Sequence, residues 1–266
     1  MQHKPKKSLG QNFLKSIPAL NMMCTASDLN TDDVVLEIGP GKGALTKKLL
    51  EKVSRVIAVE KDTELFSYLE KKFEKEIKDK QLILINEDIL EFEIQDLPHQ
   101  QTSYKIIANI PYNITGAIFK KFLSSNNQPS TMTLLIQKEV AKRIIARDNK
   151  ESILSLSVKA YGDPSYIMKV EKRFFSPSPK VDSAIITIKN ISKNKFKDEE
   201  NLFFEIIKAG FLHKRKILIK NLENLKVKLP NIKEMFQKLD INPKIRAEDI
   251  SLEIWFKILR EFNKKA

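Results

Sequence analysis

Short apolar runs alternate with amphipathic segments between residue 31 and about residue 189. The apolar runs are rich in Val, Ile and Leu, as expected for strands that are buried on both faces, and they lie at 34–38, 56–60, 82–85, 105–109 and 131–137. The segments between them have the spacing of amphipathic helices, at 45–50, 64–75, 117–123 and 139–146. This alternation predicts an α/β domain built on a doubly wound, mostly parallel sheet.

Two later apolar runs, 166–170 and 183–188, flank a proline-containing segment that has no helical pattern. They predict an antiparallel hairpin with a stiff loop. After Ile188 the composition shifts to Asn, Lys and Glu, and helical patterns follow at 202–212, 214–225 and 251–262. We therefore expect two domains, an α/β domain over 1–190 and a small C-terminal all-helical domain over 191–266.

Positive charge is the main signal of the composition. The 266 residues carry a formal net charge of +13, and residues 191–266 hold 18 Lys and Arg against 11 Asp and Glu. Residues 1–27 form an arm with no acidic residue and four lysines, Lys4, Lys6, Lys7 and Lys15, which suits a phosphate backbone. Such an excess of positive charge attracts nucleic acid or an acidic membrane surface. It is also found in proteins whose surface lysines serve only to keep them soluble.

Other features narrow the class of protein. The chain has no run of about 20 apolar residues and no apolar signal core at its N-terminus, so neither a membrane span nor a secretory signal is expected. Its single cysteine, Cys24, excludes an internal disulfide, and three scattered histidines disfavour a metal centre. We expect a cytoplasmic protein that holds no metal.

Four residues at the end of the fourth predicted strand, Asn109-Ile110-Pro111-Tyr112, carry the clearest chemical signal. In an open α/β sheet, ligands bind outside the carboxyl ends of the strands. At that place the Asn109 oxygen and a backbone carbonyl held by Pro111 suit the exocyclic amine of a flat base, and Tyr112 suits stacking on its ring. Taken alone, the four residues also fit an ordinary proline-containing turn.

Further polar features fall at the ends of the first three predicted strands. The first strand leads into a glycine-rich turn, Glu37-Ile38-Gly39-Pro40-Gly41-Lys42-Gly43, whose Gly-x-Gly-x-Gly spacing disfavours a nicotinamide oxidoreductase. Glu60, 21 positions after Gly39, can accept from both hydroxyls of a ribose, and Asp88 can accept from an adenine amine. Together these features predict a pocket for an adenosine that carries no pyrophosphate.

The same motifs resemble those of the Rossmann-like class I methyltransferases that use S-adenosylmethionine to modify the exocyclic amine of adenine. Over nearly the whole chain, the sequence resembles the ribosomal small-subunit RNA adenine dimethyltransferases, the KsgA (RsmA) family, in segments 7–14, 137–141, 174–184 and 246–251. The resemblance implies transfer of four methyl groups to two adjacent adenosines near the 3′ end of 16S rRNA. It also implies S-adenosylmethionine as cofactor, the immature small ribosomal subunit as partner, a role in its biogenesis, and a monomer.

The resemblance also implies roles for individual residues. The residues expected to contact the cofactor are Asn12, Leu14, Gly39, Gly41, Glu60, Asp88, Ile89 and Asn109. The catalytic residues are Asn109, Ile110, Pro111 and Tyr112. The residues expected to contact the target base are Tyr112 and Phe174 or Phe175. By their charge, and not by the resemblance, Lys214, Arg215 and Lys216 are the best candidates in the C-terminal domain for contacts with RNA phosphates. Since adjacent strand residues point to opposite faces, one of the two phenylalanines is expected in the core. The three basic residues also fit the solvated face of an amphipathic helix.

Two alternatives remain besides the small-subunit enzyme. The erythromycin-resistance type of methyltransferase shares the Asn-Ile-Pro-Tyr strand end but acts on large-subunit RNA. A non-catalytic assembly factor would keep the fold without the chemistry. Segments 174–184 and 246–251 favour the small-subunit enzyme, and the presence of Glu60, Asp88 and Asn109 favours catalysis.

Overall fold

The computed structural model describes residues 4–6, 9–93, 103–223, 225 and 231–263 of the chain. The chain forms two compact units, one of residues 1–141 and 162–192 and the other of residues 142–161 and 193–266. The boundary predicted at 190/191 lies next to the observed break at 192/193. The structure, however, places residues 142–161 in the second unit, and not in the α/β unit to which the sequence pattern assigned them.

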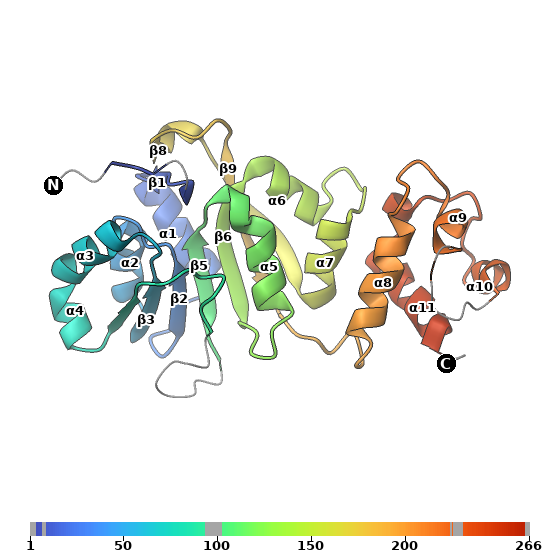
Figure 1. The fold of residues 1–266 in the computed structure, drawn as a ribbon, viewed down its shortest axis with the longest axis horizontal. Helices are drawn as coiled ribbons and strands as arrows, with labels where there is room; N and C mark the ends of the chain where they lie inside the picture. Colours follow the sequence, from blue (N-terminus) through green and yellow to red (C-terminus); the bar gives the residue numbers. More distant parts are fainter. Residues whose placement is uncertain (1–3, 7–8, 94–102, 224, 226–230, 264–266) are drawn as a thin grey trace. The chain divides into compact units, whose positions relative to one another are not determined.

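A seven-stranded sheet forms the centre of the first unit, in the order β4-β3-β2-β5-β6-β9-β7 (Figure 1). The first five strands in this order are parallel, and β9 runs antiparallel to both β6 and β7. The predicted doubly wound α/β fold and the antiparallel hairpin are therefore confirmed. The strands are β2 (Val34–Ile38), β3 (Arg55–Val59), β4 (Leu82–Ile85), β5 (Lys105–Asn109), β6 (Thr131–Gln137), β7 (Asp163–Val170) and β9 (Ser183–Lys189).

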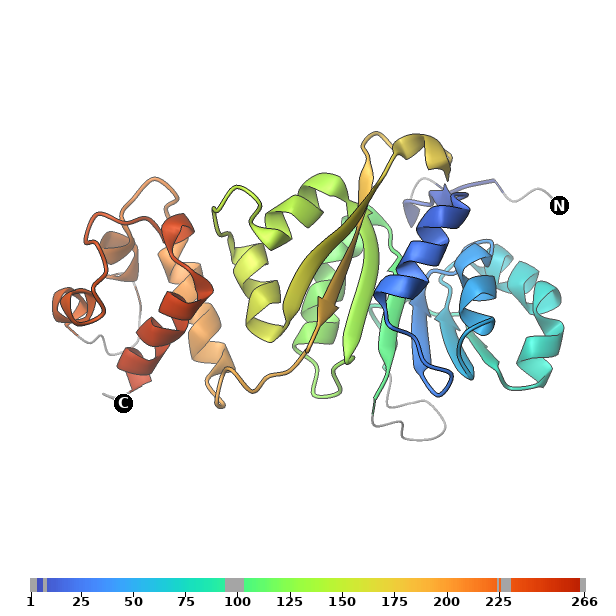
Figure 2. The same cartoon turned by 180° about the vertical axis from the view of Figure 1, so that it is seen from behind.

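Helices cover both faces of this sheet. Helix α5 lies on the face that is in front in Figure 1, and α1 lies on the face that is in front in Figure 2. The helical pattern at 64–75 forms two helices, because the chain leaves the helical conformation at Phe73. The helices that start in this unit are α1 (Ile17–Ala26), α2 (Ala44–Leu50), α3 (Thr63–Lys72), α4 (Glu74–Lys78), α5 (Thr115–Leu123) and α6 (Lys138–Ile145), with short 3-10 turns η3 (Tyr112–Ile114) and η4 (Lys172–Phe174).

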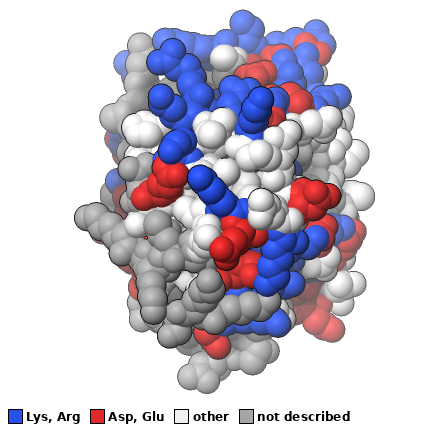
Figure 3. Space-filling view, turned by 90° about the vertical axis from the view of Figure 1, so that its right-hand side faces the viewer, with Lys and Arg blue, Asp and Glu red and all other residues white. Residues whose placement is uncertain are grey.

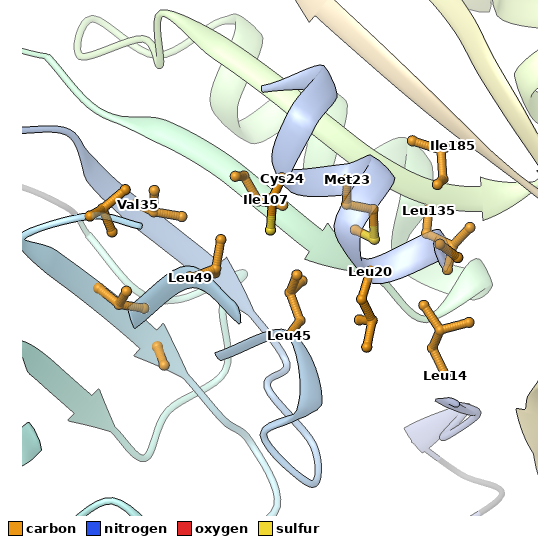
Figure 4. Packing of buried hydrophobic residues seen from close by; sticks show 14 of the residues in the cluster. Leu14, Leu20, Met23, Cys24, Val35, Leu45, Leu49, Ile107, Leu135 and Ile185 are labelled. Atoms are coloured by element: carbon orange, nitrogen blue, oxygen red, sulfur yellow. The ribbon is translucent and has the colours of Figure 1, made fainter. Parts of the chain in front are cut away.

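Helix α1 was not expected from the sequence. It begins at a serine cap, where the Ser16 side chain accepts from the amide of Ala19, and Pro18 occupies its first turn, a position where proline needs no hydrogen-bond partner. Its buried residues include Met23 and Cys24, which lie over the sheet among side chains from β5 and β6 (Figure 4). This packing fixes the strands whose carboxyl ends carry the polar residues predicted from the sequence.

A two-stranded sheet joins the N-terminal arm to the loop of the hairpin. Strand β1 (Phe13–Leu14) pairs antiparallel with β8 (Phe175–Ser176). The backbone amide of Lys15 extends this pairing by donating to the Phe174 carbonyl over 2.8 Å. The arm is thereby tied to the same edge of the molecule as the strand ends.

The second unit is all helical and has an aromatic core. Tyr161 contacts Phe196 edge to face at 4.9 Å, and the rings of Phe203 and Phe256 stack at 4.6 Å. Trp255 is fully buried. Tyr161 ends a helix that packs on two later ones, and residues 142–161 cluster with this unit. The helices are α7 (Ile153–Tyr161), α8 (Glu200–Gly210), α9 (Leu218–Leu222), α10 (Ile232–Lys238) and α11 (Leu252–Asn263), with the 3-10 turn η5 (Ala247–Asp249).

The prediction of a helix at 214–225 is wrong in its first part, because α9 begins only at Leu218. The Asn221 side chain donates to the carbonyls of Gly210 and His213, over 2.5 and 3.2 Å, and the Lys216 amide donates to the His213 carbonyl. These bonds satisfy the end of α8 and hold the intervening residues as a turn. Among the residues that the structure describes, no helix is both long and apolar enough to cross a membrane.

Candidate active site

A cavity of about 710 Å³ opens at the carboxyl ends of β2, β3 and β5. Polar and glycine residues from the N-terminal arm, the glycine turn and the strand ends line it, including Asn12, Gly39, Glu60, Asp88 and Asn109. Its volume falls within the range of pockets for drug-sized ligands, about 300–1,000 Å³. The structure therefore brings together the cofactor residues predicted from distant parts of the sequence.

The glycine turn leaves backbone open to this cavity. Gly39, Gly41 and Gly43 all have positive φ, between 60° and 72°, a conformation that favours glycine. A side chain at Gly39 would meet no atom within 4 Å, whereas one at Gly41 would meet the Phe13 ring at 3.0 Å. Gly39 thus offers a ligand close access to backbone, and Gly41 permits the arm to pack against the turn.

Glu60 lies just after β3 and is almost fully buried. Its Oε2 accepts from the amide of Gly41 over 3.0 Å, and its Oε1 accepts from the amide of Asp62 over 2.9 Å. Burial raises the pKa of this carboxyl group, and the two amide bonds oppose the rise. Each carboxylate oxygen has a further lone pair, so the group can also accept from two hydroxyls of a ribose.

Asp88 lies beyond β4 with its carboxylate held on two sides. Lys61 Nζ donates to Oδ2 over 2.6 Å, and the amide of Leu90 donates to Oδ1 over 3.0 Å. These bonds, that of Lys61 first, lower the pKa of Asp88 and keep it an acceptor at neutral pH. The neighbouring Ile89 is buried and lines the same cavity, as Leu14 does from the arm.

The side chain of Asn109 is oriented by the arm. Its Nδ2 donates to the backbone carbonyl of Asn12 over 3.0 Å, and the Asn12 side chain in turn donates to the Gly10 carbonyl. Because the amide nitrogen is engaged in this bond, Oδ1 is the atom of Asn109 that can accept from an approaching amine. Ile110 and Pro111 follow at the strand end and line the cavity with Tyr112.

The aromatic candidates differ in their surroundings. The Tyr112 hydroxyl shares a 2.6 Å hydrogen bond with Ser183 Oγ at the start of β9, which fixes the position of its ring. Phe175 is 3% exposed and belongs to the core, so it cannot offer a face to a base as the structure stands. Phe174 is half-buried, with the Arg173 guanidinium 5.1 Å from its ring centre, and remains the candidate of the pair.

The basic candidates Lys214, Arg215 and Lys216 lie in the second unit. All three are exposed on the turn between α8 and α9. They do not form the solvated face of a helix, because α9 begins after them. Figure 3 shows many Lys and Arg side chains on the upper part of the face drawn there, with acidic side chains interspersed among them there and lower down. Lys7, a basic residue of the predicted arm, is outside the described residues.

Known proteins match the chain over nearly its whole length. A model of the family described as "Ribosomal RNA adenine dimethylase" matches residues 2–264. The chain is 38% identical to Ribosomal RNA small subunit methyltransferase A of Fusobacterium nucleatum, covering 98% of this chain and 99% of that protein. It is 39% identical to the protein of the same name from Dehalococcoides mccartyi, covering 97% and 89%.

The chain belongs to the ribosomal RNA adenine dimethylase family.

Solved structures agree with this dimethylase fold. A dimethyladenosine transferase from Plasmodium falciparum superposes with a TM-score of 0.80 at 25% identity, covering 95% of this chain and 98% of that one. The 23S rRNA methyltransferase ErmE superposes with a TM-score of 0.75 at 22% identity, covering 95% and 100%, which shows a shared fold. The family membership and the Rossmann-like fold with a C-terminal helical domain, both predicted from the sequence, are confirmed.

Glu37 of this dimethylase is a site residue to which the sequence reasoning gave no role. It lies one residue before the end of β2, lines the cavity and is 1% exposed. Among the described residues its Oε2 makes no hydrogen bond. Burial raises the pKa of Glu37 to about 8. A buried carboxyl group with an unused acceptor suits a cationic ligand group. The sequence signal that could have pointed to Glu37 is its acidic side chain at the start of the glycine-rich segment, two residues before Gly39.

Replacement of Glu37 by Gln should change how stability depends on pH. Between about pH 4.5 and about pH 8 the carboxyl group is ionised in the unfolded chain and protonated in the folded one. The folded state then holds the extra proton, so this group's contribution to the free energy of unfolding falls as pH rises, by up to about 1.4 kcal/mol per pH unit.

Glu37→Gln should remove this slope. Urea unfolding of the ligand-free wild-type and variant proteins from pH 5 to pH 8 measures it. A difference in the free energy of unfolding that stays constant across this range would contradict the assignment.

Proposed function

We propose that this dimethylase transfers four methyl groups from S-adenosylmethionine to the exocyclic amines of two adjacent adenosines near the 3′ end of 16S rRNA. The family and its full-length relatives named as small-subunit methyltransferases support the reaction and the RNA. The proposed substrate is the immature small ribosomal subunit, methylated as a step of its biogenesis. We further propose a cytoplasmic enzyme that acts as a monomer.

The observation that carries this proposal is the orientation of the Asn109 amide. The lone pair of an aromatic amine is delocalised into its ring, so the amine is a poor nucleophile. Asn109 Oδ1 and the carbonyl of Ile110 can each accept one N–H, which favours a pyramidal nitrogen with its lone pair available. The bond from Nδ2 to the Asn12 carbonyl fixes Oδ1 as the acceptor before the base arrives.

Alignment of the two reactants then supplies much of the acceleration. Holding reacting groups in a near-attack geometry is worth up to roughly 7–11 kcal/mol in favourable intramolecular cases. No strong general base is required, because the amine becomes acidic once it carries a methyl group and a positive charge, and its proton can pass to water. Burial raises the pKa of Tyr112, so its hydroxyl stays neutral and serves to position the ring.

The residues that line the cavity support S-adenosylmethionine as the cofactor. When bound, this cofactor supplies a methyl group on a positively charged sulfur. Glu60 would hold the ribose, and Asp88 would accept from the adenine amine, with Ile89 packing on its ring. The orphaned Oε2 of Glu37 suits the ammonium at the methionine end, near Gly39. Asn12 and Leu14 would complete the wall from the arm.

The target base must leave its stack to reach Asn109. Stacking on an aromatic side chain is worth about 1–3 kcal/mol per base, which offsets a cost of similar size for unstacking. Tyr112 would take one face of the base, since Ser183 holds its ring at the strand end. Phe174 would cover the other face, and the structure favours it over the buried Phe175.

One assay separates the proposed function from its alternatives. Labelled S-adenosylmethionine is incubated with the protein and unmethylated small subunits, large subunits or no RNA, and the modified nucleotides are mapped. We expect label only in the small subunit, as dimethyladenosine at two adjacent positions. Label in the large subunit would show the erythromycin-resistance type of activity, and no label with any substrate would show a non-catalytic factor.

Asn109→Ala should remove most of the methylation activity and leave the fold intact. We expect a loss of about 100-fold or more, the size seen when a single aligned polar group is removed from an active site. Initial rates of methyl transfer to unmethylated small subunits measure the effect. The melting temperature controls for misfolding. A folded variant with near-normal rates would refute the role given to Asn109.

The turn of Lys214, Arg215 and Lys216 should contribute to RNA affinity by binding phosphates. Removal of each phosphate-binding side chain should reduce the slope of log K against log salt by about 0.7–0.9, so that the triple alanine variant binds small subunits more weakly and with less salt dependence. Binding measured at several salt concentrations tests this.

A matched control removes three exposed lysines from α3 and α4, Lys71, Lys75 and Lys78. This control should retain the wild-type slope. Equal slopes for the wild-type protein and the variant without Lys214, Arg215 and Lys216 would exclude that turn from the RNA interface.

A further inference from the structure

The N-terminal arm is fastened to the cofactor edge of the first unit by one buried carboxylate, that of Asp62. Asp62 is 2% exposed. Its Oδ1 accepts from Lys6 Nζ over 2.9 Å, and its Oδ2 accepts from Gln11 Nε2 over 2.8 Å. The Gln11 Oε1 accepts from the Lys6 backbone amide over 2.7 Å. We call Lys6, Gln11 and Asp62 the Asp62 cluster.

These bonds are strong enough to oppose the burial of the carboxylate. Burial alone would raise the pKa of Asp62, but the bonds from Lys6 and Gln11 outweigh it and lower the pKa below its ordinary value. The same pairing raises the pKa of Lys6. Lys6 also contacts the exposed carboxylate of Glu64 at 3.1 Å. Asp62 thus stays charged at neutral pH and holds two side chains of the arm.

A short segment of the arm, residues 10–12, connects the Asp62 cluster to Asn109. One residue after Gln11, the Asn12 carbonyl accepts the hydrogen bond from the Asn109 amide. A side chain at Gly10 would lie 3.3 Å from Pro111, so the arm also packs closely on this strand end. Residues 10–12 therefore span from the end of β3 to the end of β5.

We propose that Asp62, acting through Lys6 and Gln11, is a positioning residue for methyl transfer. The cluster fixes the arm, and the arm places the Asn12 carbonyl that orients Asn109. Asp62 is not among the residues that line the cavity, so it acts through the arm and not by touching the reactants. This inference rests on the proposed function, because Asn109 is the group whose orientation it explains.

Asp62 has a second role that a test must separate from the first. It is the N-cap of α3, where its Oδ1 accepts from the amide of Glu64 over 3.0 Å, and its own amide donates to Glu60. Asn is as good an N-cap as Asp. Asp62→Asn therefore keeps the cap and the backbone bond to Glu60. It removes the charge that holds Lys6 and also the oxygen that accepts from Gln11.

The kinetic test combines Asp62→Asn with Asn109→Ala. In the wild-type background we expect Asp62→Asn to lower kcat by at least about tenfold, because it weakens the charge-assisted bond from Lys6 and removes the bond from Gln11. In the Asn109→Ala background it should lower the residual single-turnover rate by less than about twofold, because the group that it positions is gone. An equal loss in both backgrounds, or no loss in either, would overturn the proposal.

Variants of Lys6 give the matched control. Lys6→Met should reproduce the loss in kcat, and Lys6→Arg should restore most of it, since a guanidinium can also donate to the carboxylate. Lys75→Met removes the same charge from the exposed surface of α4 and should leave kcat unchanged. A similar loss from Lys75→Met and Lys6→Met would assign the effect to net charge and overturn the role of Asp62.

A second measurement needs no methylation and so distinguishes failure of this proposal from failure of the proposed function. Limited trypsin digestion of the full chain without RNA, followed by mass spectrometry, reports release of the N-terminal segment at Lys15. Asp62→Asn should be cut there about tenfold faster than the wild-type protein, at an unchanged melting temperature. Equal cleavage rates would overturn the Asp62 cluster as the fastening of the arm, whatever the enzyme methylates.

Discussion

The buried carboxylate of Glu60 is the interaction on which the geometry of the cofactor edge depends. It accepts from Gly41 in the turn after β2 and from Asp62 at the start of α3, so one side chain links two strand ends. A carboxylate buried in this way is costly unless hydrogen bonds satisfy it. The two amides do so, and they also leave it poised to accept from the hydroxyls of a ribose.

Acidic and basic side chains gather at different places in the structure. The carboxyl groups of Glu37, Glu60 and Asp88 gather at the cavity, where a cofactor that carries two positive groups and several donors would bind. Lys4 and Lys15 of the arm, and the basic residues of the turn before α9, are exposed, so that phosphates can reach them. Asn109, at the end of β5, is uncharged, which suits a group that must order an amine without taking its proton.

Much of this arrangement could be predicted from the sequence, because apolar strand runs and the residues that follow them are local signals. Strands β2, β4, β5 and β6 have the predicted bounds, and Asn12, Glu60, Asp88 and Asn109 line one cavity. The rest depends on contacts between distant segments. The pairing of β1 with β8 joins residues more than 160 positions apart, and the side chain of Asn221 decides that residues 213–216 form a turn. Likewise, aromatic packing of Tyr161 moves residues 142–161 into the second unit.

The central claim is that the arm orients Asn109 so that its oxygen receives the target amine. A high-resolution structure of the protein with S-adenosylhomocysteine and a short RNA carrying the target adenosine tests this claim most directly. The account predicts Asn109 Oδ1 and the Ile110 carbonyl within hydrogen-bond distance of the adenine amine nitrogen, with Nδ2 still donating to Asn12. A base seated in the pocket whose amine contacts neither oxygen, or an Asn109 side chain turned away from Asn12, would contradict it.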